Sequence, residues 1–231
     1  MIYVLSSILG SNLPVSQIIA YMLGYVLALI IAFSMHEFSH AFSAYKLGDP
    51  TPKAMGRLTL NPVKHIDIVG MLGFLIVGFG WAKPVPINPL NFRKYRRDNF
   101  IVSISGVLTN LILAFIFSGV LHFFYYELAS QDPSGAVYSN SLLYFIHYFL
   151  EYSVILNLAL FIFNLIPVYP LDGFNAVKSF ARYNNRFVNF MYKYGNIIML
   201  VIILTPVFDI IYQGATGYLL GVFDNFWGLF G

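Results

Sequence analysis

Four long runs of apolar residues dominate the hydrophobic pattern of the chain. A membrane-spanning helix needs about 20 consecutive, mostly apolar residues, and each run is close to or above that length. The first run, from Ile18 to Met35, carries no charge, and its helix is expected to continue through HEFSHAFSAYKLG until Gly48 and Pro50. The other three runs occupy residues 100–126, 142–168 and 195–211. The pattern therefore predicts four spanning helices.

Two further apolar segments do not have the pattern of an ordinary span. IVGMLGFLIVGFGW, from Ile68 to Trp81, is short, rich in glycine, and flanked by Lys64 and Lys83. A re-entrant segment fits it better, because irregular backbone is tolerated at membrane depth where protein covers it. The tail GYLLGVFDNFWGLFG, which follows the break at Pro206, is aromatic and typical of an interfacial segment. The predicted fold is an all-α membrane protein: a multi-pass helical bundle with about four spanning helices, a re-entrant or β-loop segment and an interfacial C-terminal segment.

Lysine and arginine are confined to three loops, which follow the first span, precede the second, and connect the third to the fourth. The loop at 127–140 has neither residue. Because basic loops stay on the cytoplasmic side, we expect the N-terminus outside and the segment 68–80 open to the cytoplasm. The N-terminal stretch lacks a basic region, and so no cleaved signal peptide is expected. This topology also brings the ends of the first and third spans to one face of the membrane.

The composition narrows the class of protein and of metal site. Of 231 residues, 58% are hydrophobic and 10% are charged, as expected for a protein of the cell membrane, in contact with the lipid bilayer. We expect a single polytopic domain over residues 1–231 and no nucleic-acid partner. The chain contains no cysteine, which excludes disulfides and cysteine-ligated metal centres. Histidine and carboxylate remain as metal ligands.

Two histidines and a glutamate lie within five residues at the end of the first span. His36 and His40 are four residues apart and share a helix face, while Glu37 is turned by about 100 degrees. This is the HExxH zinc motif. Such a site, with three protein ligands and an open position, lowers the pKa of a water to about 7, and Glu37 would transfer that water's proton to the leaving amine. The alternative, an accidental polar cluster, is disfavoured because each ionisable group in a membrane helix costs about 2.5 to 3.5 kcal/mol.

A third metal ligand is expected at the same membrane face. Asp172 follows NLIPVYP, whose prolines end the third helix. On the residues alone, two roles stay open for it, a metal ligand or the N-cap of the next short helix, GFNAVKSFARY. His65 and Asp67 lie in a loop on the same face and are further candidates. Glu151 and His147 are weaker ones, because about 30 Å of helix separates them from Asp172.

Five motifs together carry a family resemblance. HEFSHAFSAYKLGD, GRLTLNPVKHID, GWAKPVPIN, SGVLTN and NLIPVYPLDG occur in this order within residues 32–182. In this, the chain resembles the site-2 protease family of intramembrane zinc metalloproteases, in the short form without a PDZ or CBS domain. The resemblance implies one zinc ion per chain, with His36, His40 and Asp172 as ligands and Glu37 as general acid and base.

Two positions depart from the family's pattern, and one residue within it has two interpretations. Val107 stands where the GPxxN pattern has proline, and Phe174 where a second glycine often follows LDG. Both affect local helix geometry and pocket shape more than the chemistry. Asn110 matches the asparagine of GPxxN. It is expected either to donate a hydrogen bond to substrate or oxyanion, or to form a polar contact between helices.

The segment GFGWAKPVPINP could contact the substrate directly. It alternates apolar and polar residues, and its prolines suit an exposed edge to which an unwound substrate adds as a strand. This hypothesis follows the resemblance to the family's membrane-associated β-loop and includes Trp81 and Lys83 as substrate-binding candidates, with His65 nearby. The alternative is an ordinary loop in which Trp81 and Lys83 anchor the chain at the interface.

The function predicted from the sequence is zinc-dependent intramembrane endopeptidase activity. Its substrates would be single-span membrane proteins, cut in or near the spanning helix near the cytoplasmic face, as in regulated intramembrane proteolysis, with a membrane protein as a plausible regulatory partner. Two alternatives remain. One is a protease-like protein that binds membrane partners without cutting them. The other is a transporter, which the absence of a ladder of charges across the spans disfavours.

Overall fold

Four long helices form the frame of the protein, as the sequence predicts. The computed structural model describes residues 14–76, 80–124 and 140–230, and within these it contains helices and no strand. Four of the helices are long and apolar enough to cross a membrane: α2 (Val15–Lys46), α5 (Tyr95–Phe124), α7 (Ser141–Leu165) and α9 (Arg186–Leu204). Each contains most of one predicted apolar run. The N-terminal end and most of the 127–140 loop lie outside the described residues.

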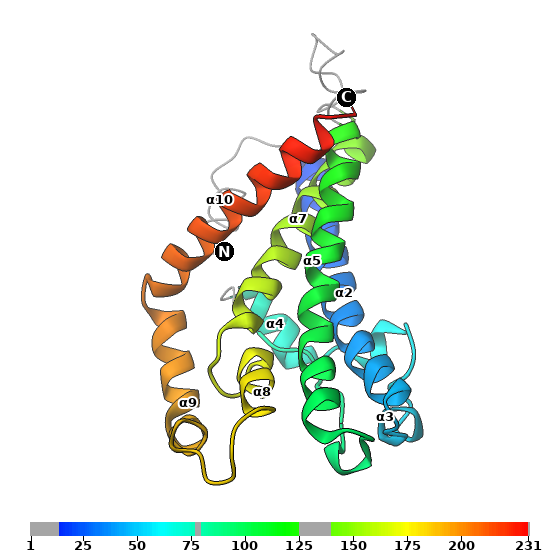
Figure 1. Cartoon of the computed structure of the whole chain (residues 1–231). Coiled ribbons are helices and arrows are strands. Elements are labelled where there is room, and N and C mark those ends of the chain that lie inside the picture. The colour runs from blue at the N-terminus through cyan, green and yellow to red at the C-terminus, as the bar shows by residue number, and fades with distance from the viewer. Residues whose placement is uncertain (1–13, 77–79, 125–139, 231) are drawn as a thin grey trace.

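Helices α2, α5 and α7 pack side by side and make the core (Figure 1). Small residues let α2 and α7 approach closely. A Cβ atom at Gly24 would lie 2.9 Å from the backbone nitrogen of Phe149, and buried Ala28, Leu29 and Ala32 of α2 form a cluster with leucines of α7. Membrane helices associate through such close packing, because lipid provides no hydrophobic drive between them. The outward-facing side chains of α2 and α5 include many exposed apolar residues, as contact with lipid requires.

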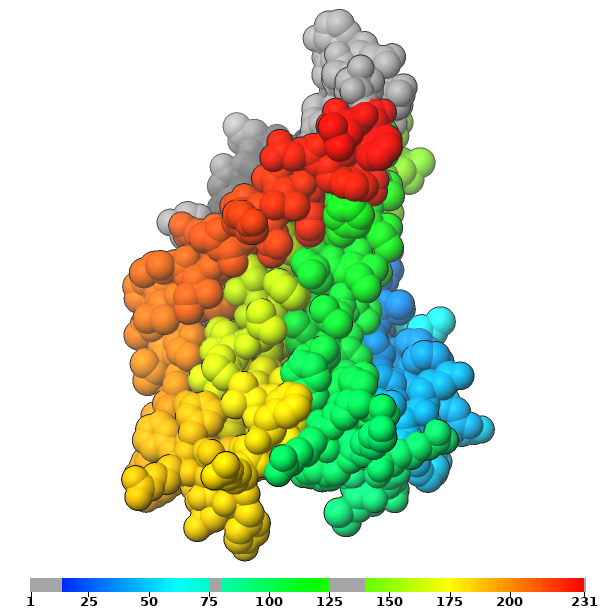
Figure 2. Space-filling view, viewed as in Figure 1, coloured from blue at the N-terminus to red at the C-terminus, as the bar shows by residue number. Residues whose placement is uncertain are grey.

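The C-terminal tail continues as a helix. After α9, the chain breaks at Pro206 and α10 (Val207–Trp227) begins. The α10 helix crosses the far end of α5 (Figure 1), where the indole of Trp227 stacks on Phe115 and donates a hydrogen bond of 3.0 Å to Ser118 Oγ. In the space-filling view, α9 and α10 form one continuous flank of the molecule (Figure 2). The tail thus packs against the far end of α5.

Short elements gather at one end of the bundle. They are α3 (Thr51–Ala54), η1 (Pro62–Lys64), α4 (Ile68–Ile76), η2 (Pro89–Asn91) and α8 (Asp172–Lys178). After α4 the chain returns to its own start, where Lys83 N donates to His65 O at 2.8 Å and Gly70 lies against the backbone of Trp81. This return is what a re-entrant segment requires, although residues 77–79 lie outside the described part. Residues 80–88 form neither a helix nor a strand within the described chain.

The topology brings the ends of the first and third spans together, as predicted. The C-terminal end of α2, the start of α5, helix α8 after α7, and the start of α9 all lie at the same end of the bundle (Figure 1). The HExxH residues of α2 and the LDG residues of α8 therefore face a common space. This is where the candidate site lies.

Candidate metal centre and active site

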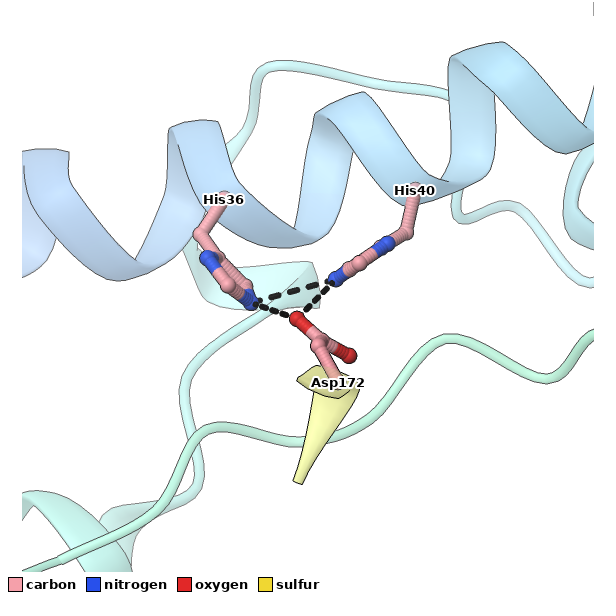
Figure 3. Close-up of side chains that lie close together, drawn as sticks. All are labelled: His36, His40 and Asp172. Carbon is pink, nitrogen blue, oxygen red and sulfur yellow. Dashed lines mark hydrogen bonds and ion pairs between the residues drawn. The ribbon is translucent and has the colours of Figure 1, made fainter. Parts of the chain in front are cut away.

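Three side chains from two distant segments converge on one point. His36 and His40 extend from successive turns of α2, and Asp172, 132 residues after His40, is the first residue of α8 (Figure 3). His36 Nε2 and His40 Nε2 lie 3.1 Å apart, and Asp172 Oδ2 is 3.1 Å from the first and 3.0 Å from the second. Both histidines are buried. Within the described residues, this is the cluster of His, Asp or Glu whose ligand atoms could hold one metal ion.

A glycine on α5 makes room for the two imidazoles. A Cβ atom at Gly106 would lie 2.5 Å from His40 Nε2 and 2.7 Å from His36 Cε1. Any larger residue would therefore occupy the space of the two imidazoles. Gly106 belongs to the motif SGVLTN, but no role could be predicted for it from the sequence. The pattern of its own helix does not show which residues of α2 lie opposite.

Local geometry at the end of α7 presents the carboxylate of Asp172 to the histidines. The N-cap of α8 is Leu171, and no side chain caps this helix. Gly173 lies so close to the carbonyls of Leu165 and Ile166 that a Cβ atom would collide with them. The described geometry therefore does not support the alternative role of Asp172 as helix cap. Burial raises the pKa of Asp172, but His40 and His36 outweigh it and lower the pKa, so the carboxylate stays ionised.

The two departures from the family's pattern leave the site intact. Val107, which is buried, continues α5 without a kink-forming proline. The fully buried ring of Phe174 packs edge-on against Tyr169, in the link between α7 and α8, and against Tyr192 of α9. Phe174 therefore packs between these segments and is not among the described residues that line the cavity.

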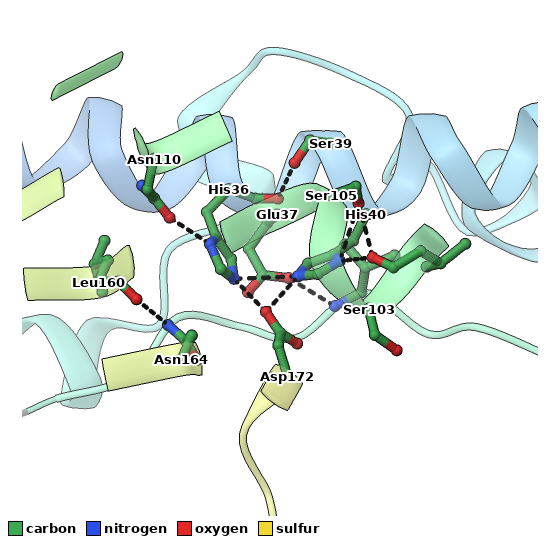
Figure 4. A network of polar contacts seen from close by, with 12 residues as sticks. His36, Glu37, Ser39, His40, Ser103, Ser105, Asn110, Leu160, Asn164 and Asp172 are labelled. Carbon is green, nitrogen blue, oxygen red and sulfur yellow. Dashed lines mark hydrogen bonds and ion pairs between the residues drawn. The ribbon is translucent and has the colours of Figure 1, made fainter. Parts of the chain in front are cut away.

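Both histidines are held from behind by partners on α5 (Figure 4). His40 Nδ1 lies 2.8 Å from the carbonyl oxygen of Val102, and His36 Nδ1 lies 2.6 Å from Asn110 Oδ1. A carbonyl only accepts, and so His40 donates its Nδ1 hydrogen to Val102, which would leave Nε2 as the atom that binds a metal ion. Such hydrogen bonds at the second nitrogen fix tautomer and ring orientation in metal-binding histidines.

The donor set and its geometry fit zinc. Two imidazole nitrogens and one carboxylate oxygen are zinc ligands, and a tetrahedral ion bound at about 2.0–2.2 Å separates its ligand atoms by about 3.3–3.6 Å. The three atoms here are 3.0–3.1 Å apart. Only a slight outward movement is therefore needed to admit the ion, which would keep a fourth position open.

Glu37 lies beside this cluster and touches the segment that follows the re-entrant loop. Its Oε2 accepts a hydrogen bond of 3.0 Å from the backbone N–H of Val85. Glu37, the three candidate ligands and this segment line a common cavity of about 690 Å³. The segment contributes Gly80, Trp81, Ala82, Pro84, Val85, Ile87 and Pro89 to the cavity wall. Opposite, polar side chains from α7 and α8 line the cavity, namely Asn164, Asn175 and Lys178.

The remaining predicted residues have different surroundings. Trp81 lines the cavity with half of its surface exposed. Lys83 is exposed, and neither it nor His65 is among the described residues that line the cavity. His65 is fully buried and its Nε2 lies 2.8 Å from the carbonyl oxygen of Thr59. Asn110 is fully buried behind His36. The structure thus brings Trp81 to the cavity and Asn110 to His36, and places His65 within a loop.

The weaker ligand candidates lie elsewhere. Asp67 Oδ1 accepts a hydrogen bond of 2.9 Å from Gly70 N and so caps α4. His147 and Glu151 pair with each other on α7, with Nε2 and Oε2 3.5 Å apart. None of the three belongs to the cluster of candidate ligands. Sequence reasoning missed Asn157, which lies behind Asn110. Its signal was an amide among the apolar residues of the third run.

Comparison with known proteins gives consistent results. The model of Peptidase family M50 matches residues 24–205. "Putative zinc metalloprotease YwhC" of Bacillus subtilis (strain 168) is 41% identical over 182 residues, which cover 77% of this chain and 78% of that protein. "Putative zinc metalloprotease Rip2" of Mycolicibacterium smegmatis (strain ATCC 700084 / mc(2)155) is 27% identical over 217 residues, covering 86% of this chain and 78% of that protein. No solved structure matches the chain.

Proposed function

Because the chain belongs to Peptidase family M50 and is a zinc metalloprotease of the membrane, we propose that it is an intramembrane endopeptidase. Its substrates are single-span membrane proteins, which it cuts in or near the spanning helix. One observation carries the proposal. The HExxH histidines and the LDG aspartate meet within 3.1 Å, at a cavity that Glu37 shares, at one end of a bundle of spanning helices.

Each residue of the site has a separate task. His36, His40 and Asp172 would hold zinc through Nε2, Nε2 and Oδ2. When bound, zinc would supply the Lewis acidity that activates water for attack near pH 7. Glu37 accepts the proton of the attacking water and delivers it to the leaving nitrogen of the peptide. Asn110 serves as a positioning residue for His36, because its amide oxygen contacts His36 and its amide nitrogen donates to Asn157.

The segment 80–88 forms the substrate-facing wall. A peptide inside a spanning helix must unwind before its bond is accessible, and a segment that is neither helix nor strand has backbone groups to offer to an unwound strand. Trp81 contributes apolar surface to the cavity, while Lys83 is exposed outside it. The backbone of Val85 holds Glu37 at this wall. Photo-crosslinkers at positions 80–88 should label a bound substrate, and labelling confined to the opposite side of the cavity would contradict this role.

The site lies near the cytoplasmic face, where water is available for hydrolysis. The basic loops adjoin the end of the bundle that contains the site, and such loops stay inside. The native chain has no cysteine, and single cysteines therefore report the orientation cleanly. Met55→Cys, at the site end, and Leu229→Cys, near the other end, are both at exposed positions. An impermeant thiol reagent added outside cells should label Leu229→Cys and spare Met55→Cys. In this orientation the N-terminus is also outside.

The decisive test measures zinc and cleavage together. Purified protein in detergent is offered a single-span substrate, and bound zinc is measured in the same preparation. Glu37→Gln should keep zinc and lose cleavage, because the amide cannot accept the proton. Full cleavage by Glu37→Gln would contradict the mechanism. Substrate binding without cleavage by the zinc-loaded wild type would instead support a protein that holds membrane partners.

A further inference from the structure

A chain of hydrogen bonds extends from His36 through the core to helix α7. His36 Nδ1 lies 2.6 Å from Asn110 Oδ1 on α5, and Asn110 Nδ2 donates to Asn157 Oδ1 on α7 at 2.8 Å. Asn157 Nδ2 in turn donates to the carbonyl oxygen of Ser153, one turn earlier, at 2.7 Å. Both asparagines are completely buried. Three helices are thus linked by side chains whose last member faces a backbone carbonyl.

Donors and acceptors can follow one another along these hydrogen bonds in only one direction. The carbonyl of Ser153 accepts and never donates, so the NH₂ group of Asn157 must face it and its oxygen must face Asn110. The NH₂ group of Asn110 therefore faces Asn157 and also the carbonyl of Ala32, at 3.3 Å. Its oxygen is left to face His36. An oxygen there requires a hydrogen on His36 Nδ1, so that in the neutral imidazole that binds a metal ion the lone pair is on Nε2.

The opposite direction would be incompatible with metal binding. If the Asn110 amide were reversed, its NH₂ group would face His36 Nδ1 and the imidazole hydrogen would move to Nε2. That nitrogen, which lies 3.1 Å from Asp172 Oδ2, could then no longer bind an ion. Asn157 stands against the reversal, because its oxygen accepts only from an NH₂ group on the near side of Asn110.

We propose that Asn157 is a positioning residue for the metal centre. Acting through Asn110, it selects the tautomer of His36 that binds zinc and holds the ring in place. The inference rests on the proposed function only in taking His36 as a zinc ligand. Outer partners of metal-binding histidines commonly change metal affinity about 10- to 100-fold, and hydrogen-bonded chains in a low dielectric strengthen one another. A purely structural contact between α5 and α7 would stabilise the fold without affecting zinc.

The test measures zinc affinity by competition with a chelator, in purified full-length protein in detergent. Asn157→Leu, which removes the amide, should weaken zinc binding about tenfold. Asn157→Asp should stay close to wild type, because a buried carboxylic acid is protonated, donates to the Ser153 carbonyl and still accepts from Asn110. Ser153→Ala is the matched control. It removes a buried hydroxyl that, within the described part of the chain, donates to the Phe149 carbonyl of its own helix, and it should leave zinc affinity unchanged.

A double-mutant cycle separates positioning from a general loss of structure. If Asn157 acts through Asn110, Asn157→Leu should cause no further loss of zinc affinity in a protein that already carries Asn110→Leu. An equal loss in both backgrounds, or unchanged zinc affinity in Asn157→Leu, would overturn the proposal. Should the leucine variant fail to fold, Asn157→Ser replaces it, since a serine hydroxyl reaches its own helix but not Asn110. The same outcomes apply.

Failure of this proposal is distinguishable from failure of the proposed function. If Asp172→Ala leaves zinc affinity unchanged, the metal site itself is wrong. If Asp172→Ala weakens zinc while Asn157→Leu does not, the metal site stands and only the role of Asn157 is refuted.

Discussion

Glu37 Oε2 accepts a hydrogen bond of 3.0 Å from the backbone N–H of Val85, a residue of the segment that lines the cavity. The contact joins the candidate proton-transfer group to the candidate substrate wall. Because the donor belongs to the backbone, the identity of the side chain at position 85 does not maintain it. A movement of this segment on substrate binding would therefore be transmitted directly to Glu37.

Removing the Val85 donor should slow cleavage without loss of zinc. Val85→Pro lacks the N–H, and a hydrogen bond to a charged group contributes about 1.5–3 kcal/mol. We expect kcat/KM to fall about ten- to hundredfold while bound zinc stays the same. Val85→Ala retains the N–H and serves as the control, with near-normal kcat/KM. A proline variant as active as the alanine variant would show that the contact has no role in catalysis.

Adding one methyl group at Gly106 should disturb the metal centre. The new Cβ atom would lie 2.5 Å from His40 Nε2, which forces the ligand to move. Gly106→Ala should weaken zinc binding about tenfold or more and lower cleavage about hundredfold. Gly214→Ala in α10 is the matched control, because a Cβ atom there would meet no other part of the described chain within 4 Å beyond its own helix backbone. Titration with zinc measures the zinc affinity of both variants. A wild-type affinity in Gly106→Ala would contradict the close approach of position 106 to the imidazoles.

Asp49 should make the fold sensitive to acid. This fully buried carboxylate accepts hydrogen bonds from Thr51, from the Asn91 side chain and from Asn88 N, and so fixes the end of α2 to the segment 88–91. Burial raises its pKa, but the hydrogen bonds, led by that of Thr51, outweigh burial and lower the pKa below its ordinary value. Its contribution to stability is therefore complete above about pH 4 and is lost as the pH falls through the lower folded-state pKa.

Thermal unfolding in detergent tests this role. Asp49→Asn should reduce the free energy of unfolding by about 1–3 kcal/mol at pH 7, and the gap to wild type should narrow below about pH 4. Asp209→Asn, at an exposed position of α10, should change little at either pH. A gap between wild type and Asp49→Asn that stays constant at acid pH would contradict the assignment.

Removal of the metal should separate the ligands from Glu37. A chelator should abolish cleavage by the wild type, and added zinc should restore it. Asp172→Ala should weaken both zinc binding and cleavage, because one of three ligands is lost. Excess zinc should partly restore cleavage by Asp172→Ala and should not restore Glu37→Gln. Zinc-dependent rescue of Glu37→Gln would place Glu37 among the ligands instead.

Much of the architecture could be predicted from the sequence, because bilayer thickness sets helix length and helix period sets faces. The four apolar runs became α2, α5, α7 and α9, and the break at Pro206 separated α9 from α10. The spacing of His36 and His40 placed both on one face of a helix whatever its neighbours were. The distribution of basic residues predicted that the HExxH and LDG segments lie at the same end of the bundle.

The roles of loop residues and of buried polar residues could not be predicted from helix length and helix period. His65 lies in the loop that contains several candidates, yet its imidazole bonds to Thr59 within that loop. The sequence left Asp172 open between a helix cap and a ligand, and only the close approach of Gly173 to the end of α7 turns its carboxylate to the histidines.

The sequence by itself determined the number of spanning helices, the face shared by His36 and His40, and the resemblance from which zinc and a third ligand were expected. Only the tertiary structure decided that Gly106 faces the imidazoles, that Val85 holds Glu37, and that Asn110 links His36 to Asn157. The physical reason is that periodicity defines directions within one helix. The partner that a buried polar group meets depends on the rotation and depth at which three helices pack, and these are set by contacts along their whole length.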